Sequence, residues 1–184
     1  MNDQKRRETW KVSVDAIKAA IRDVPDFPKP GIVFKDISPI LQDAALFREC
    51  IDTMAALTES MKPDILACID ARGFIFGSAI AYRLGCGMCM IRKAGKLPWQ
   101  TEQVSYDLEY GSNVVEMHRD AVRPGENVVI VDDVLATGGT AKAAIDLVRR
   151  VGGNVAGVLF FLELSFLEGR SGLQPHQVMS LITV

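Results

Sequence analysis

The most constraining feature of the sequence is residues 128–141, where a strand pattern changes into a helix pattern across a short turn. Four β-branched residues, Val128 to Val131, predict a strand that is covered on both faces. From Thr140 onward, apolar residues recur at helical spacing, and Gly152 and Gly153 then provide a stop signal. The run therefore predicts a buried strand that leads directly into an amphipathic helix.

The turn between this strand and helix predicts a phosphate-binding site. It consists of five residues with little side-chain bulk: Ala136, Thr137, Gly138, Gly139 and Thr140. Two glycines let successive amides point inward at a helix N-terminus, where the helix dipole also favours a dianionic phosphate. Asp132 and Asp133, just before the turn, are acceptors that suit ribose hydroxyls or the water on a Mg²⁺ ion. The run thus predicts a ribose 5-phosphate pocket, and a buried strand with an unliganded glycine-rich turn is the alternative.

Composition and charge restrict the class of protein. The chain has 184 residues, of which 48% are hydrophobic and 24% charged, which is typical of a globular α/β domain and not of a disordered chain. A net charge of −2 argues against a nucleic-acid surface. The longest apolar run, residues 155–162, is too short to span a bilayer, and the charged N-terminus shows no secretion signal. We therefore expect a cytoplasmic protein without a membrane or nucleic-acid partner, in which Cys86 and Cys89 are small buried residues and not metal ligands.

Helix and strand patterns alternate through most of the chain. Helical spacing of apolar residues predicts helices over residues 9–24, 46–57, 73–84 and 140–151. Apolar runs predict strands over residues 65–69, 88–91, 128–131, 155–162 and 177–184, the last at an edge. This order predicts an α/β fold with a mostly parallel, twisted sheet flanked by helices.

Basic residues follow two of the predicted strands. Arg72 comes after the strand at 65–69, and Arg92 and Lys96 come after the strand at 88–91. Strand ends of a parallel sheet converge, so these cations predict an anion site beside the turn. The alternatives are a surface ion pair between Arg72 and Asp70, and a solvated charged loop.

Two further segments have unusual patterns. Residues 26–37 follow Pro25 and contain two more prolines and a glycine, which favour an extended loop in which Phe34 could stack on a flat heterocycle; a core aromatic residue is the alternative. Residues 98–117 predict a two-stranded hairpin with polar faces, which could serve as a lid that excludes water. Glu109 lies near its tip, where it is either carried into the site or simply exposed.

Five motifs together resemble those of the adenine phosphoribosyltransferase family, a branch of the type I phosphoribosyltransferases. They are residues 26–37, 71–74, 91–98, 106–111 and 128–141, in family order and with family-like spacing. The resemblance implies one domain over residues 1–184, with an N-terminal helix and base-binding hood at about 1–36 and a flexible flap at about 98–117. It also implies a homodimer that makes AMP and pyrophosphate from adenine and 5-phosphoribosyl 1-pyrophosphate (PRPP).

The resemblance also implies a role for each site residue. The turn 136–140 would bind the 5-phosphate, Asp132 and Asp133 the ribose hydroxyls, and Glu109 would be the acid/base. Pyrophosphate would be bound by Arg72, Arg92 and Lys96, with Arg92 acting either within its own chain or across a dimer interface. The base would be bound by Val33, Phe34, Lys35 and Leu164. Mg²⁺ would be held mainly by PRPP and water.

Three positions depart from the common family pattern: Lys35, Ala94 and Ala71. If position 35 acts through its backbone, Lys35 has little effect, whereas Ala94 raises the question of how firmly the pyrophosphate loop is held. Two other functions remain open. One is a transferase for xanthine, hypoxanthine or guanine, and the other is a PRPP-binding transcriptional regulator.

Overall fold

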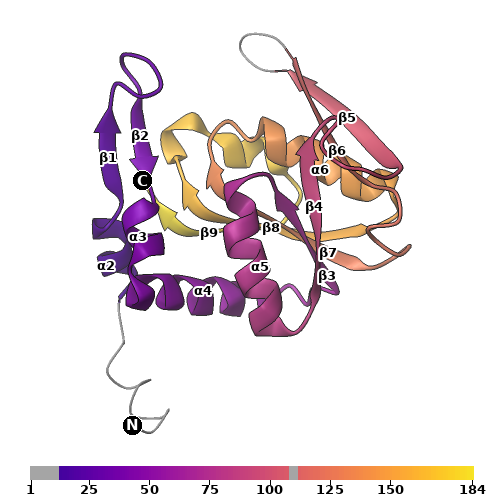
Figure 1. Cartoon of the computed structure of the whole chain (residues 1–184), viewed down its shortest axis with the longest axis horizontal. Coiled ribbons are helices and arrows are strands. Elements are labelled where there is room, and N and C mark those ends of the chain that lie inside the picture. Colours follow the sequence, from indigo (N-terminus) through magenta and orange to yellow (C-terminus); the bar gives the residue numbers. More distant parts are fainter. Residues whose placement is uncertain (1–12, 108–111) are drawn as a thin grey trace, which may run out of the picture. The chain divides into compact units, whose positions relative to one another are not determined.

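A seven-stranded sheet organises residues 54–184 in the described part of the computed structural model, which covers residues 13–107 and 112–184 (Figure 1). The strand order is β5-β6-β4-β3-β7-β8-β9. Strands β3, β4, β7, β8 and β9 are parallel, and the antiparallel hairpin β5–β6 joins them through β6. The predicted mostly parallel sheet is therefore confirmed. The strands are β3 (Ile65–Ile69), β4 (Gly87–Lys93), β5 (Thr101–Asp107), β6 (Ser112–His118), β7 (Asn127–Leu135), β8 (Asn154–Glu163) and β9 (Val178–Thr183).

Helices α5 (Arg72–Leu84) and α6 (Gly139–Arg150) cover opposite faces of this sheet. Side chains alternate along β3, so Ala67 belongs to the core cluster under α6, whereas Cys68 points toward α5. A Cβ added to Gly77 of α5 would lie 2.1 Å from the Cys68 sulfur, so this helix packs directly against the strand. Gly77 thus permits close packing, whereas its neighbour Ser78 is exposed and takes no part in it. After β8 the chain forms two short 3₁₀ helices, η1 (Ser165–Leu167) and η2 (Gly169–Leu173).

The chain divides into two compact units, Met1–Thr53 and Met54–Val184, which are described separately. The N-terminal unit contains α2 (Val14–Ala19), β1 (Arg22–Pro25), β2 (Val33–Asp36) and α3 (Ser38–Gln42). Helix α4 (Ala44–Glu59) begins in this unit and ends in the other. Among the described residues, Ser13 caps α2 by accepting a hydrogen bond from the Ala16 amide (3.2 Å).

The predicted helix over residues 9–24 is correct for Val14–Ala19 and wrong beyond Ala19, and its first four residues lie outside the described part. Strand β1 replaces the last turn because it pairs with β2 in an antiparallel hairpin. Across this hairpin Lys35 contacts Asp23 (2.7 Å) and Arg22 contacts Asp36 (2.8 Å). The extended segment predicted over residues 26–37 therefore contains a strand that pairs with residues expected to be helical.

The hairpin β5–β6 has an apolar base, which corrects the prediction of two polar faces. Val104, Val115 and Met117 are buried in the core under α6, and β6 pairs with β4. The base of the predicted flap is thus part of the sheet, whereas residues 108–111, including Glu109, lie outside the described part.

No helix within residues 13–107 and 112–184 is both long and apolar enough to cross a membrane. The cysteine prediction is correct for Cys89, which is buried, and burial raises the pKa of its thiol to about 12. Cys86 is only half-buried.

Candidate active site

Strand β7 carries the acidic pair and leads into the small-residue turn. The strand was predicted to end at Val131, just before the acids. It continues through Leu135, so Asp132 and Asp133 lie within the strand. The chain then turns at Gly138, whose φ of 86° is readily adopted only by glycine, and α6 begins at Gly139. This turn and Asp132 line an open hollow. The hollow leaves room for an anion beside the backbone amides of the turn.

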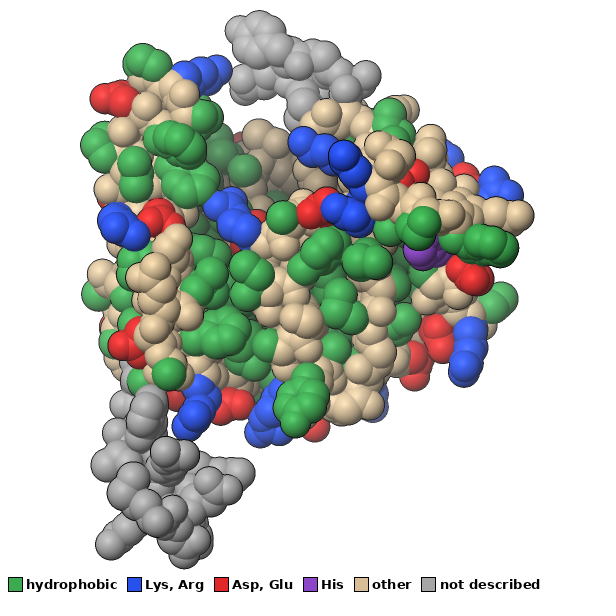
Figure 2. All heavy atoms as spheres, viewed as in Figure 1, with side chains coloured by type: hydrophobic (Ala, Val, Ile, Leu, Met, Phe, Trp, Pro, Cys, Tyr) green, Lys and Arg blue, Asp and Glu red, His purple; other side chains and the backbone are tan. Residues whose placement is uncertain are grey.

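A second hollow adjoins the first, because Asp132 and Thr140 line both. Its polar lining includes residues at the ends of strands and the starts of two helices: Asp70 after β3, Arg92 of β4, Tyr106 of β5, Asp132 and Asp133 of β7, Arg72 of α5 and Thr140 of α6. The structure therefore gathers the acidic pair, two of the three predicted pyrophosphate ligands and the start of α6 around these two adjoining hollows, which we call the cleft. Figure 2 shows Lys and Arg side chains grouped with acidic ones over the end of β4.

The arginines of this cleft are paired with acids. Arg72 contacts Asp133 (Nε to Oδ2, 2.6 Å), and Arg92 donates a hydrogen bond to Asp70 (3.0 Å). Arg72 thus has an ion-pair partner, Asp133, that the alternative of a pair with Asp70 did not foresee. Both arginines nevertheless lie in the cleft, where a guanidinium can bind a phosphate through its planar fork.

Burial raises the pKa of both carboxyls of the acidic pair and so disfavours the state in which both are ionised. The pKa of Asp132 lies well above its usual range because the carboxyl is buried and Asp133 is adjacent. Burial also raises the pKa of Asp133, although the Arg72 guanidinium partly offsets this effect. A ligand that brings hydroxyl donors or a cation would favour the ionised form of both groups.

Lys96 is placed differently from the two arginines. Its side chain is exposed, and within the described residues it is not part of the cleft lining. Its backbone is held firmly, since the Lys96 amide donates to Glu116 (2.9 Å) and its carbonyl accepts from Arg92 (3.0 Å).

The predicted base-binding residues Val33, Phe34 and Lys35 lie on β2 of the N-terminal unit. Phe34 packs edge-on against Phe27, with ring centroids 5.2 Å apart, and Val33 is half exposed. The Lys35 side chain pairs with Asp23, so it is already used within the hairpin. Their role in base binding stays a prediction.

Leu164 follows β8 at the point where β7 gives way to the turn. Its amide donates a hydrogen bond to the carbonyl of Leu135 (2.9 Å), the last residue of β7. The structure thus places Leu164 beside the start of the turn, and its role in base binding stays a prediction.

Comparison with known proteins identifies the family. Residues 36–174 match the model of the phosphoribosyl transferase domain. An adenine phosphoribosyltransferase from Roseiflexus sp. is 56% identical over 162 residues, covering 88% of this chain and 94% of the relative. The chain belongs to the adenine phosphoribosyltransferase family. Among solved structures, the adenine phosphoribosyltransferase of Thermoanaerobacter pseudethanolicus superposes with a TM-score of 0.91 at 49% identity, covering 94% of this chain and all of that one. The Saccharomyces cerevisiae enzyme, crystallised with an imino-altritol bisphosphate and adenine, gives 0.87 at 40% identity, with coverage of 91% and 97%.

Membership of the adenine phosphoribosyltransferase family makes the chain an enzyme. Two residues of the hairpin to which the sequence assigned no role contact the site or the loop beside it. Glu116 is 2% exposed and accepts hydrogen bonds from the amides of Lys96 and Leu97 (both 2.9 Å), and from Thr101 and Gln103. It therefore fixes the loop after β4, which answers the question raised by Ala94. Its signal in the sequence was a charged residue within an otherwise apolar strand.

The second such residue is Tyr106, on the hairpin strand β5. Its hydroxyl accepts a hydrogen bond from Thr140 (3.1 Å), and both side chains line the cleft. This contact connects the hairpin with the start of α6, directly after the turn 136–140. The sequence placed Tyr106 in the predicted hairpin but gave no indication of its partner.

Proposed function

We propose that the chain transfers the 5-phosphoribosyl group of PRPP to adenine and releases pyrophosphate. The observation that carries this proposal is the cleft, in which two adjoining hollows are lined by a small-residue turn at a helix N-terminus, two carboxylates and two arginines. Family membership supports it independently, as do the names of the relatives and the adenine bound to the Saccharomyces cerevisiae structure.

Each part of the cleft has a part in the proposed reaction. The amides of the turn 136–140 would bind the 5-phosphate, and Asp132 and Asp133 would accept hydrogen bonds from the ribose hydroxyls. The bond between the anomeric carbon and the pyrophosphate oxygen breaks, and a new bond forms to N9 of adenine, which loses its proton. Arg72 and Arg92 would stabilise the negative charge that develops on the leaving pyrophosphate.

Mg²⁺ belongs to the proposal as an ion that arrives with PRPP. In the described residues no three His, Cys, Asp or Glu side chains form a metal site, but Asp132 and Asp133 both line the cleft. One or two carboxylates, water and substrate phosphates are the usual surroundings of this ion, so the residues fit it. When bound, Mg²⁺ would neutralise charge on the pyrophosphate, and the acidic pair would orient its water molecules.

The base site and the acid/base are proposed from the resemblance. Phe34 would stack on adenine, the backbones of Val33 and Lys35 would read its edge, and Leu164 would cover the other face. Glu109 would handle the proton of N9. We expect Glu109→Ala to lower turnover far more than the affinity for adenine, measured by steady-state kinetics and by direct titration; unchanged turnover would remove Glu109 from the mechanism.

A homodimer and a cytoplasmic location also remain proposals. Large apolar side chains that are exposed in the single chain favour a dimer: Ile75 (38% exposed) and Tyr82 (91%) lie seven residues apart on one face of α5, and Met90 (40%) is on β4. Sedimentation of the purified protein tests the dimer. Arg92 already contacts Asp70 and Lys96 of its own chain, so its proposed reach across an interface requires these contacts to change.

One assay separates the candidate functions. The protein is incubated with PRPP, Mg²⁺ and each purine in turn, and pyrophosphate release is followed. Preferred turnover of adenine supports the proposal, and preferred turnover of a 6-oxopurine would replace adenine by another base. Salt-dependent DNA binding without turnover of any purine would favour the regulator.

A further inference from the structure

The segment η2 lies directly behind the phosphate-binding turn. Gly169, its first residue, is buried, and a Cβ placed on it would lie 2.1 Å from the carbonyl oxygen of Ala136. Conversely, a Cβ on Gly138 would lie 2.6 Å from the carbonyl oxygen of Gly169. The two backbones are therefore in contact in both directions, with no side chain between them.

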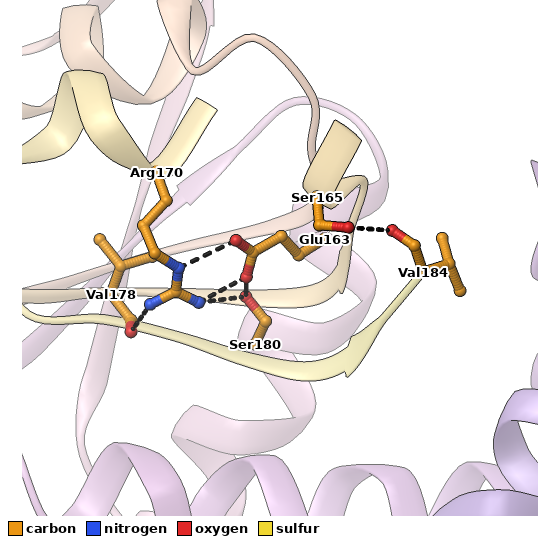
Figure 3. Close-up of polar contacts among 6 residues, drawn as sticks. All are labelled: Glu163, Ser165, Arg170, Val178, Ser180 and Val184. Carbon is orange, nitrogen blue, oxygen red and sulfur yellow. Dashed lines mark hydrogen bonds and ion pairs between the residues drawn. The ribbon is translucent and has the colours of Figure 1, made fainter. Parts of the chain in front are cut away.

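Arg170, the next residue, fastens this segment to the edge of the sheet (Figure 3). Its guanidinium donates two hydrogen bonds to Glu163 at the end of β8, one of them from Nε at 2.9 Å. It also donates to the carbonyl of Val178 (2.6 Å) and to the hydroxyl of Ser180 (3.3 Å), both on β9. Ser180 in turn donates to Glu163 (2.7 Å). We call Glu163, Arg170 and Ser180 the strand-end clamp.

The clamp is built from strong interactions. Glu163 is 7% exposed and ionised, since the hydrogen bonds from Arg170 lower its pKa despite its burial. A bidentate arginine–carboxylate pair at a mostly buried position fixes both distance and orientation. In register, Glu163 lies opposite Leu135, the last residue of β7 before the turn. The clamp thus starts at the strand pair that leads into the turn and holds the segment that supports the turn from behind.

We propose that the strand-end clamp, acting through Gly169, positions the amides of residues 136–140 and so sets the affinity for the 5-phosphate. Glu163 and Arg170 are positioning residues, since neither lines the cleft among the described residues. This proposal deepens the proposed function and rests on it for the identity of the ligand. It applies to the 5-phosphate end only, because the contacts of Gly169 are with the turn and not with Arg72 or Arg92.

Two glycines of the same segment provide a matched test. Neither Gly169 nor Gly172 has a positive φ, so alanine is compatible with both backbones. An added Cβ would collide with Ala136 at Gly169 but would meet nothing within 4 Å at Gly172. We expect Gly169→Ala to weaken binding of ribose 5-phosphate by about tenfold, the effect of losing about one hydrogen bond to a charged group. Gly172→Ala should bind it as the unchanged protein does.

Pyrophosphate provides the internal control, because it should bind at Arg72 and Arg92. Calorimetric titration of each variant with ribose 5-phosphate and, separately, with pyrophosphate should show a loss for Gly169→Ala with the first ligand only. Equal losses for both ligands would indicate a general structural defect, and no loss for either would leave the turn independent of η2. Either result overturns the proposal.

A second pair of variants covers the case in which Gly169→Ala does not fold. Arg170→Lys keeps the charge but loses the bidentate geometry. Arg149→Lys makes the same change at an exposed arginine, whose guanidinium contacts His176 (2.9 Å). The first should weaken ribose 5-phosphate selectively, and the second should not; identical behaviour refutes the clamp. If the unchanged protein binds ribose 5-phosphate but makes no AMP, the proposed function fails while the clamp is still tested. If it does not bind ribose 5-phosphate at all, both fail.

Discussion

Replacing Glu116 by glutamine tests whether one buried carboxylate holds the loop after β4. The side chain is 2% exposed and its Oε1 accepts the amides of both Lys96 and Leu97. Burial alone would raise the pKa of this carboxyl, but hydrogen bonds from the loop amides and from Gln103 outweigh burial and lower the pKa. At neutral pH the wild-type group is therefore ionised, and Glu116→Gln removes the charge while keeping the shape.

The size of the effect follows from these hydrogen bonds. A bond to a charged acceptor contributes about 1.5–3 kcal/mol and a neutral one about 0.5–1.5 kcal/mol, so each amide loses about 1 kcal/mol. The two amides together give a loss of about 2 kcal/mol in the free energy of unfolding. Because Arg92 donates to the carbonyl of Lys96, we also expect the KM for PRPP to rise by about three- to tenfold, with a smaller change in the KM for adenine.

Glu102, on the facing strand of the same hairpin, is the matched control. It pairs with Arg119 (3.6 Å) and Arg150 (3.5 Å), which are both exposed, and such pairs contribute little. Urea denaturation followed by circular dichroism at pH 7 should show the loss for Glu116→Gln and a change within about 0.5 kcal/mol for Glu102→Gln.

The pH dependence gives an independent check. A carboxyl whose pKa is lowered in the folded state adds stability above its unfolded pKa, and this stability disappears as pH falls through the folded pKa. The difference between wild type and Glu116→Gln should therefore be full at pH 7 and vanish at strongly acidic pH. Equal stability of the two proteins at pH 7, with an unchanged KM for PRPP, would show that the carboxylate does not hold the loop.

Three further predictions concern the cleft and the sheet beneath it. Asp132→Asn should raise the thermal midpoint at pH 7 by about 3 °C while abolishing turnover. The pKa of this carboxyl is raised in the folded protein, so its ionised form opposes folding at any pH above the unfolded pKa. The gain should therefore vanish near pH 3, as measured by scanning fluorimetry across pH. Tyr106→Phe removes the hydrogen bond from Thr140 and should raise the KM for PRPP about fivefold with little change in kcat; an unchanged KM in steady-state assays would deny the connection. Gly77→Ala places a methyl 2.1 Å from a sulfur of β3 and should destabilise by about 2 kcal/mol in urea, whereas the exposed Ser78→Ala should not.

The central strands could be predicted from the sequence because their patterns are local. Residues 65–69 form a strand as expected, and β7 and β8 contain the predicted runs 128–131 and 155–162. Their apolar residues are buried on both faces, so continuous hydrophobicity was a sufficient signal. The extension of β7 through Asp132 and Asp133 gave no such signal, because acidic residues are rarely buried. The contact of Asp133 with Arg72, which compensates for this burial in part, becomes visible only in the structure.

The N-terminal helix failed for the opposite reason. Ile21 and Val24 continue a helical spacing, but Arg22 to Pro25 pair with β2, eight to fourteen residues away in the sequence. That pairing, together with the ion pairs from Asp23 and Asp36, outweighs a local preference for helix. No feature of residues 9–24 alone contains this information.

The candidate site shows the same division between local pattern and long-range pairing. That acids and bases would gather at strand ends followed from a parallel sheet, but which arginine meets which aspartate depends on register. Strand β3 pairs with β4 so that Ile69 lies opposite Ile91, which makes Asp70 and Arg92 neighbours. Arg72, two residues farther along on α5, is thereby left to meet Asp133. Candidate ligand-binding residues could thus be predicted from strand-end position and chemistry. The residues that orient them, such as Glu116, become visible only when the pairing of β6 with β4 and β5 is known. This pairing brings the buried carboxylate of Glu116 against the loop after β4.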